Sequence, residues 1–271
     1  MNPIDTVFRS LRAASRKAFI PFVPAGDPDM AATAKIVREL DGCGCHLVEI
    51  GFPFSDPIAD GPVIQAAYTR ALDRGLRVDD IFTGVDGLTK AANPIQAPLV
   101  GMVSYSLIHR RGPAAFVDRA KQTGFAGLIV PDLPAEEADG LAEQVAERGL
   151  KLIMLVTPTT PPARAERIVK LSSGFVYCVS VAGITGERDR LPDELLGQLR
   201  HLRGMTALPL CVGFGVSRPD HVRMLRNEVD GVIVGSAIVR RLEKATAANW
   251  GTVTAEIRDQ VQSLLDALNP G

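Results

Sequence analysis

The chain has 271 residues, of which 46% are hydrophobic, and its 30 basic residues nearly balance 31 acidic ones. A chain of this length can bury a large core, either as one closed barrel or as two small domains. The net charge of -1 and the pI near 6.4 exclude the basic excess that a nucleic-acid or acidic-membrane surface requires. The richest apolar run, residues 19–25, is far shorter than a membrane span. We therefore expect neither nucleic acid nor a membrane as a partner.

The cysteines do not form the pattern of a disulfide framework. All four lie in or beside apolar runs: Cys43, Cys45, Cys178 and Cys211. The first two, with the neighbouring His46, are conceivable metal ligands, but no second Cys/His pair lies at a matching spacing. We expect free thiols, no metal site and a cytoplasmic location.

The N-terminal segment allows two interpretations. Four basic side chains near a serine are compatible with a transit peptide: Arg9, Arg12, Arg16 and Lys17. Apolar side chains, however, recur there at helical spacing: Ile4, Val7, Phe8 and Leu11. This periodicity favours an N-terminal helix that belongs to the fold.

From residue 18 onward, predicted strands and helices alternate along the chain. The strands are expected at residues 18–23, 47–51, 98–104, 126–130, 150–156, 174–180, 208–212 and 231–234. The helices are expected at residues 30–40, 62–72, 78–91, 113–122, 135–148, 162–171, 192–202 and 218–226, with one from 237 and one after 250. Two helices therefore follow the second strand and two follow the last.

Eight strands that alternate with helices predict an α/β fold with a closed parallel sheet. We expect a single TIM barrel, a (β/α)₈ domain over residues 1–271, with an extra N-terminal helix and extra helices after strands 2 and 8. An open doubly wound sheet is the alternative. Such a sheet has a glycine-rich turn after its first strand, whereas here the glycine-rich turns follow strands six, seven and eight.

Two carboxylates occur in the stretch from residue 47 to residue 65. Glu49 lies within an apolar strand, where a charged group loses its hydration. Its carboxylate either forms a structural ion pair with a Lys or Arg of a neighbouring strand or takes part in the chemistry of the site. Asp60 precedes Gly61 and Pro62, so it is either the N-cap of a helix or a second chemical group at the same end of the barrel.

Glycine-rich loops follow three neighbouring strands near the C-terminus, at residues 183–186, 213–215 and 235–236. Glycines allow close backbone approach to an anion, and helix N-termini point N–H groups at it, so the loops predict a phosphate site. Apolar residues near other strand ends predict an apolar, partly aromatic lining: Phe22, Ile129, Leu155, Tyr177 and Ile233. No lysine occurs late in a strand where a Schiff base could form, so the chemistry falls to the two acids.

Residues 49–65, Glu-Ile-Gly-Phe-Pro-Phe-Ser-Asp-Pro-Ile-Ala-Asp-Gly-Pro-Val-Ile-Gln, closely resemble the signature of the tryptophan synthase alpha subunit family. Further landmarks of that family occur in its order, at residues 19–28, 131–134, 183–186 and 213–217. The resemblance covers the whole chain. One departure is the sequence Ser-Leu-Ile at residues 106–108, where the family commonly has Asn-Pro.

The resemblance implies retro-aldol cleavage of indole-3-glycerol phosphate to indole and glyceraldehyde 3-phosphate, without a cofactor in this chain. It also implies that Glu49 is the general acid/base and that Asp60 holds the indole N–H. The remaining implied site residues bind the indole, position the acid or bind the phosphate. They are Phe22, Ile129 and Tyr177 for indole, Thr185 beside the acid, and Gly186, Gly215, Gly235 and Ser236 for phosphate. A desolvated glutamate suits a proton donor, whereas a loop aspartate near water is expected to stay ionised.

The resemblance also implies a partner, a beta subunit that carries pyridoxal phosphate, in an alpha2-beta2 heterotetramer. The loop with Pro53 and Asp56 is the family's contact region, and residues 183–191 form its lid. Two alternatives stay open: a free-standing lyase, and a catalytically weak barrel that mainly activates a partner.

Overall fold

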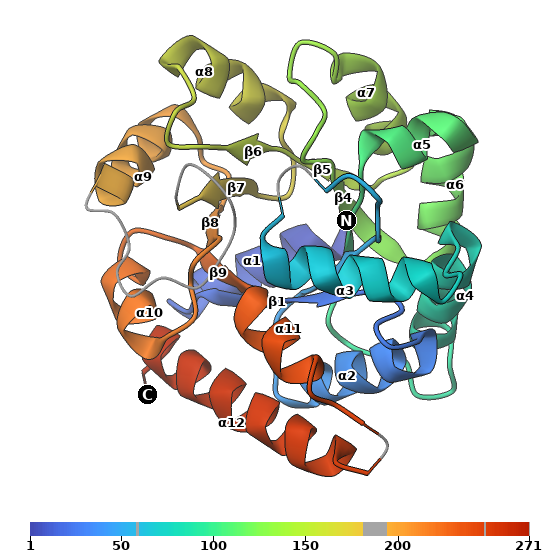
Figure 1. The fold of residues 1–271 in the computed structure, drawn as a ribbon. Coiled ribbons are helices and arrows are strands. Elements are labelled where there is room, and N and C mark those ends of the chain that lie inside the picture. Colours follow the sequence, from blue (N-terminus) through green and yellow to red (C-terminus); the bar gives the residue numbers. More distant parts are fainter. Residues whose placement is uncertain (58–59, 181–193, 247, 271) are drawn as a thin grey trace.

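The computed structural model describes residues 1–57, 60–180, 194–246 and 248–270. Within these residues, nine parallel strands lie in the order β5-β4-β3-β2-β1-β9-β8-β7-β6. The strands form a nearly closed barrel, and helices surround it (Figure 1). The architecture is therefore the predicted TIM barrel.

The elements follow one another in strict alternation over most of the chain. The strands are β1 (Ala18–Pro24), β2 (Val48–Gly51), β3 (Leu99–Met102), β4 (Phe125–Ile129), β5 (Lys151–Ile153), β6 (Leu155–Val156), β7 (Val176–Val179), β8 (Leu210–Gly213) and β9 (Gly231–Val234). The helices are α1 (Pro3–Ala13), α2 (Met30–Gly42), α3 (Pro62–Asp73), α4 (Val78–Thr89), α5 (Tyr105–Arg111), α6 (Pro113–Thr123), α7 (Asp139–Glu147), α8 (Pro162–Leu171), α9 (Glu194–Met205), α10 (Pro219–Leu225), α11 (Ser236–Leu242) and α12 (Trp250–Leu268). The expected extra helices after the second and last strands are α4 and α12.

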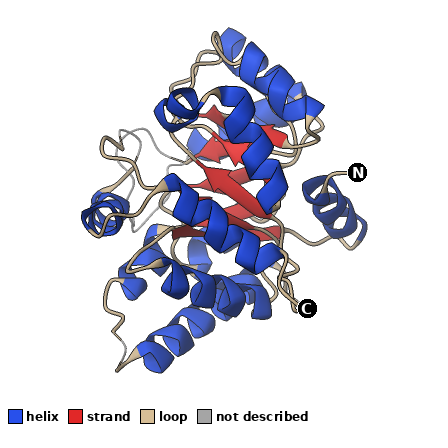
Figure 2. Cartoon of the chain, turned by 90° about the vertical axis from the view of Figure 1, so that its right-hand side faces the viewer, coloured by secondary structure: helices blue, strands red, loops and turns tan. Residues whose placement is uncertain are grey.

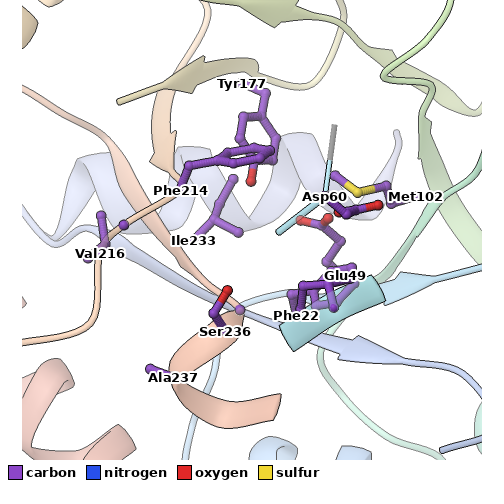
Figure 3. A pocket seen from close by; sticks show the side chains of 13 residues that line it. Phe22, Glu49, Asp60, Met102, Tyr177, Phe214, Val216, Ile233, Ser236 and Ala237 are labelled. Atoms are coloured by element: carbon purple, nitrogen blue, oxygen red, sulfur yellow. The ribbon is translucent and has the colours of Figure 1, made fainter. Parts of the chain in front are cut away.

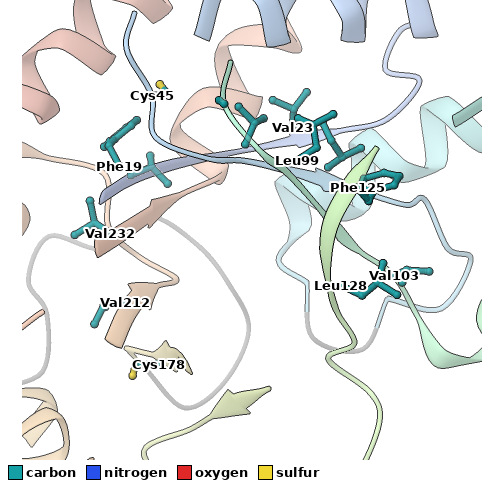
Figure 4. Close-up of a cluster of buried hydrophobic side chains, with 14 of the residues drawn as sticks. Phe19, Val23, Cys45, Leu99, Val103, Phe125, Leu128, Cys178, Val212 and Val232 are labelled. Atoms are coloured by element: carbon teal, nitrogen blue, oxygen red, sulfur yellow. The ribbon is translucent and has the colours of Figure 1, made fainter. Parts of the chain in front are cut away.

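Alternating side chains of each strand enter two separate hydrophobic cores. The outer core lies between strands and helices and contains Phe19, Leu99 and Val232 (Figure 4). The inner core fills the barrel and contains Ile20, Phe22 and Leu47. Since Glu49 follows Leu47 at a spacing of two, the pleat directs its carboxylate into the barrel.

Helix α1 closes the barrel at the amino ends of the strands. Figure 2 shows it outside the ring of helices, at one end of the sheet. Ile4 of α1 is fully buried, and a Cβ built on Gly127 at β4 would lie 3.0 Å from its Cδ1. The predicted N-terminal helix is thus part of the fold, and it leaves the carboxyl ends of the strands as the open end.

The structure differs from the sequence-based expectations in three places. The fifth strand, expected at 150–156, is divided at Met154, because its first half pairs with β4 and its second half with β7. The unpredicted helix α5 begins after Ser104 and is held by Asp132, which accepts hydrogen bonds from the Ser104 hydroxyl (2.6 Å) and the Tyr105 N–H (2.8 Å). Helix α7 begins at Asp139 instead of residue 135, because residues 134–137 form a turn.

Candidate active site

Glu49 is a carboxyl group buried inside the barrel. Its side chain is 1% exposed, and neither oxygen has a hydrogen-bond partner among the residues that the structure describes. Burial, together with the charge of Asp60, raises the pKa of Glu49 to about 8. The structural ion pair is therefore excluded for the described residues, and the group is protonated at neutral pH.

Asp60 reaches the same cavity from the loop between β2 and α3. The Gln65 amide donates hydrogen bonds to the carbonyls of Asp60 (2.7 Å) and Pro57 (3.3 Å), which fixes this loop against the first turn of α3. Gly61 is the N-cap, and no side chain caps the helix, so the capping role considered for Asp60 was wrong. Asp60 is more desolvated than expected, and this burial raises its pKa to about 6. The group is still mostly ionised at pH 7.

The two acids lie in one cavity at the open end of the barrel. It encloses about 490 Å³ of empty space, its open mouth to solvent included. In Figure 3, Glu49 and Asp60 lie near Phe22 and Met102, with Tyr177, Phe214 and Ser236 on the other side. Two carboxyl groups of different pKa thus border an apolar space.

An aromatic wall faces the acids. The rings of Tyr177 and Phe214 meet edge to face, with centroids 5.6 Å apart and an interplanar angle of 69°. Burial raises the pKa of the Tyr177 hydroxyl well above its usual value, so this group stays neutral. The wall fits a flat, apolar ring.

The predicted phosphate residues that the structure describes meet at one side of the cavity. Gly215, Gly235 and Ser236 all line it, although they come from the loops after β8 and β9. Nothing among the described residues accepts a hydrogen bond from the Gly215 or Ser236 N–H groups. Thr185 and Gly186 lie outside the described residues.

Other predicted residues lie elsewhere. Ile129 is fully buried in the inner core and does not line the cavity. In the predicted partner loop Pro53 is buried, whereas Asp56 is exposed and accepts a hydrogen bond from the Ser55 hydroxyl (2.9 Å). Asp56 also lines a second cavity, which shares Asp60 and Met102 with the first.

Sequence reasoning missed several lining residues: Ile64, Met102, Phe214, Val216 and Ala237. Tyr68 was also missed; it lies one helical turn after Ile64 on the buried face of α3. Gly51 makes room for it, since a Cβ there would lie 2.4 Å from the Tyr68 hydroxyl oxygen and 2.5 Å from Cζ of Phe22. The helical spacing of Ile64 and Tyr68 was the available signal.

Over the part of the chain that the structure describes, no group of three His, Cys, Asp or Glu residues could hold a metal ion. No described helix is long and apolar enough to cross a membrane.

The family model described as "Tryptophan synthase alpha chain" matches residues 8–269. The chain belongs to the tryptophan synthase alpha chain family. Members of this family are carbon–carbon lyases of tryptophan biosynthesis, and the chain has their activity, cleavage of indole-3-glycerol phosphate.

Individual members of the tryptophan synthase alpha chain family are similar over nearly the full length. The alpha chain of Rhodopirellula baltica is 47% identical, with 99% of each chain covered. That of Synechocystis is also 47% identical, over 91% of this chain and 92% of the relative. The solved alpha subunit from Legionella pneumophila has a TM-score of 0.87 at 32% identity, covering 99% of this chain and 98% of that one. A chain of aminoacrylate-bound tryptophan synthase from M. tuberculosis has a TM-score of 0.86 at 30% identity, covering 99% and 100%.

Proposed function

We propose that Glu49 is the general acid/base of the cleavage and that Asp60 binds the indole N–H. The observation that carries this proposal is the buried Glu49 carboxyl, which no described residue hydrogen-bonds, beside a second, more acidic carboxyl in an aromatic-lined cavity. At pH 7, pKa values of about 8 and about 6 give one protonated and one ionised acid. Such a divergence of two neighbouring groups suits one proton donor and one charge acceptor.

The reaction then needs only one proton carrier. Glu49 gives its proton to C3 of the indole ring, which places a positive charge on the ring nitrogen. The resulting carboxylate of Glu49 removes the proton of the adjacent glyceryl hydroxyl. The bond between C3 and the glyceryl carbon breaks, its electron pair returns to the ring, and indole and an aldehyde leave. Glu49 ends protonated, as it began.

The negative charge of Asp60 supports these proton transfers. Its carboxylate accepts the indole N–H and stabilises the positive charge that develops on nitrogen when C3 is protonated. Phe22 and Tyr177 border the ring site, and Gly215, Gly235 and Ser236 offer neutral donors to the phosphate. Thr185 and Gly186 keep the roles that the family resemblance implies.

The proposal includes the setting of the reaction. Residues 1–271 form one cytoplasmic domain without a cofactor of its own. A beta subunit that holds pyridoxal phosphate receives the indole in an alpha2-beta2 heterotetramer. The exposed Asp56 beside the second cavity supports a contact role for this loop.

The test is indole formation from indole-3-glycerol phosphate by Glu49→Gln and Asp60→Asn. Loss of a positioned general acid should lower kcat of Glu49→Gln by roughly 10²–10⁴-fold. Loss of the Asp60 charge should lower kcat by about 10²-fold. Glu166→Gln is the matched control, because Glu166 is exposed on α8, where it forms an ion pair with Lys170 at 2.8 Å.

Full turnover by both site variants would contradict the mechanism. The same assay with and without added beta subunit tests the partner, together with a sizing column. Activity that is high alone and unchanged by the beta subunit would instead indicate a free-standing lyase.

A further inference from the structure

Ser180 makes a hydrogen bond that the mechanism has not used. It is fully buried and follows the end of β7, where the pairing with β8 stops at Val179 and Gly213. Its N–H donates to the Gly213 carbonyl (3.1 Å), and its hydroxyl donates to the carbonyl of Phe214. The hydroxyl therefore holds the first residue of the loop beyond the strand.

Phe214 has a backbone conformation that a phenylalanine does not adopt without support. Its φ is +67°, and Ser15 is the other described residue besides glycine with a positive φ. Bulky L-residues are disfavoured in this left-handed region, so surrounding contacts must hold Phe214 there. The bond from Ser180 fixes the backbone, and the contact with Tyr177 fixes the ring.

The bond also determines the direction of a donor. The carbonyl of Phe214 and the N–H of Gly215 belong to one planar trans peptide, in which the two groups point in opposite directions. A carbonyl held toward Ser180 therefore turns the Gly215 N–H away from Ser180. Gly215 lines the cavity, and no described residue accepts its N–H.

We propose that Ser180 is a positioning residue for the substrate phosphate. Its hydroxyl locks the Phe214–Gly215 peptide so that the Gly215 N–H faces the cavity before the substrate arrives. This inference rests on the proposed function, in which Gly215 is a phosphate donor. Preorganised donors bind more tightly because the loop is not ordered at the moment of binding.

The experiment measures KM and kcat for Ser180→Ala, and the inhibition constants of two probes, glycerol 3-phosphate and indole. Without the Ser180 bond the Gly215 N–H is no longer held toward the cavity, and weakening one hydrogen bond to an anion should raise KM and the inhibition constant of glycerol 3-phosphate about tenfold. Both kcat and the indole constant should change by less than about twofold, because the two acids are unaltered and the contact with Tyr177 still holds the Phe214 ring. Ser180→Cys, of similar size but a weak donor, should give an intermediate rise.

Ser172→Ala is the matched control, since the Ser172 hydroxyl is also buried and donates to a carbonyl, that of Ile168 (2.8 Å), away from the cavity. It should keep wild-type constants. Equal increases in the inhibition constants of both probes, or no increase in either constant, would overturn the role of Ser180. If Ser180→Ala does not fold, unchanged constants in Ser180→Cys would do the same. An inactive Glu49→Gln beside a fully normal Ser180→Ala would leave the proposed function standing and remove only this inference.

Discussion

The two ends of the barrel differ in how well their polar groups and backbone are accommodated. At the closed end, polar groups of α1 are satisfied: Asn2 caps the helix (2.9 Å) and donates to the carbonyls of Ala126 (2.8 Å) and Gly149 (2.9 Å). At the open end, a buried carboxyl group finds no hydrogen-bond partner among the described residues, and a phenylalanine has a left-handed backbone. The difference indicates that the closed end supplies stability, while the open end holds disfavoured groups that chemistry needs.

The largest expected effect in the closed end comes from Phe8→Ala. Phe8 is 5% exposed and packs against Phe175 with ring centroids 5.7 Å apart. Removing such a ring leaves a cavity and should lower the free energy of unfolding by about 3–5 kcal/mol, as measured by urea denaturation. Folded Phe8→Ala should keep kcat and KM within about twofold of wild type. A large loss of kcat at unchanged stability would show that the two ends are not separate in function.

The next largest effect comes from a substitution in the open end, which we expect to raise the free energy of unfolding instead of lowering it. Because the pKa of Glu49 is raised from 4.5 to about 8, the folded state binds more protons than the unfolded state between these pH values. Stability is therefore lost as pH rises through this window. Glu49→Gln should remove that loss and raise the free energy of unfolding above pH 8 by an amount on the order of a few kcal/mol.

The control is the pH itself, since the advantage of Glu49→Gln should shrink toward pH 4, where both states of the wild type carry a protonated carboxyl. Denaturation curves at pH 4, 6 and 9 check this. A variant that is less stable than wild type at pH 9 would show that Glu49 contributes to folding.

The smallest effect is the shape of the pH profile. Catalysis requires Asp60 ionised and Glu49 protonated, so kcat/KM of the isolated chain should be greatest near pH 7. It should fall tenfold per pH unit below about 6 and above about 8. A profile that keeps rising to pH 9 would assign the proton transfer to another group.

Much of the open end could be predicted from the sequence because its signals are local. Glu49 is unusual within its own strand, and Gly215, Gly235 and Ser236 stand out in their own loops. Ile129 shows the limit: nothing local separates it from the other apolar residues of the inner core, of which Phe22 and Tyr177 line the cavity.

The features that were not predicted from the sequence depend on contacts between distant segments. Helix α5 is held by Asp132 from the loop after β4, and the fifth strand is divided at Met154 because its two halves have different neighbours. The conformation of Phe214 depends on Ser180, 34 residues away. None of these partners can be identified from the segment that it constrains.

The most direct test of the account is the protonation state of Glu49. The infrared C=O band of a protonated carboxyl can be titrated from pH 5 to pH 9 in the wild type, with Glu49→Gln subtracted. The account predicts a band that disappears with a midpoint near pH 8, and at lower pH in Asp60→Asn, because Asp60 raises the pKa of Glu49. Absence of the band above pH 5, as for a glutamate of ordinary pKa, would contradict the account.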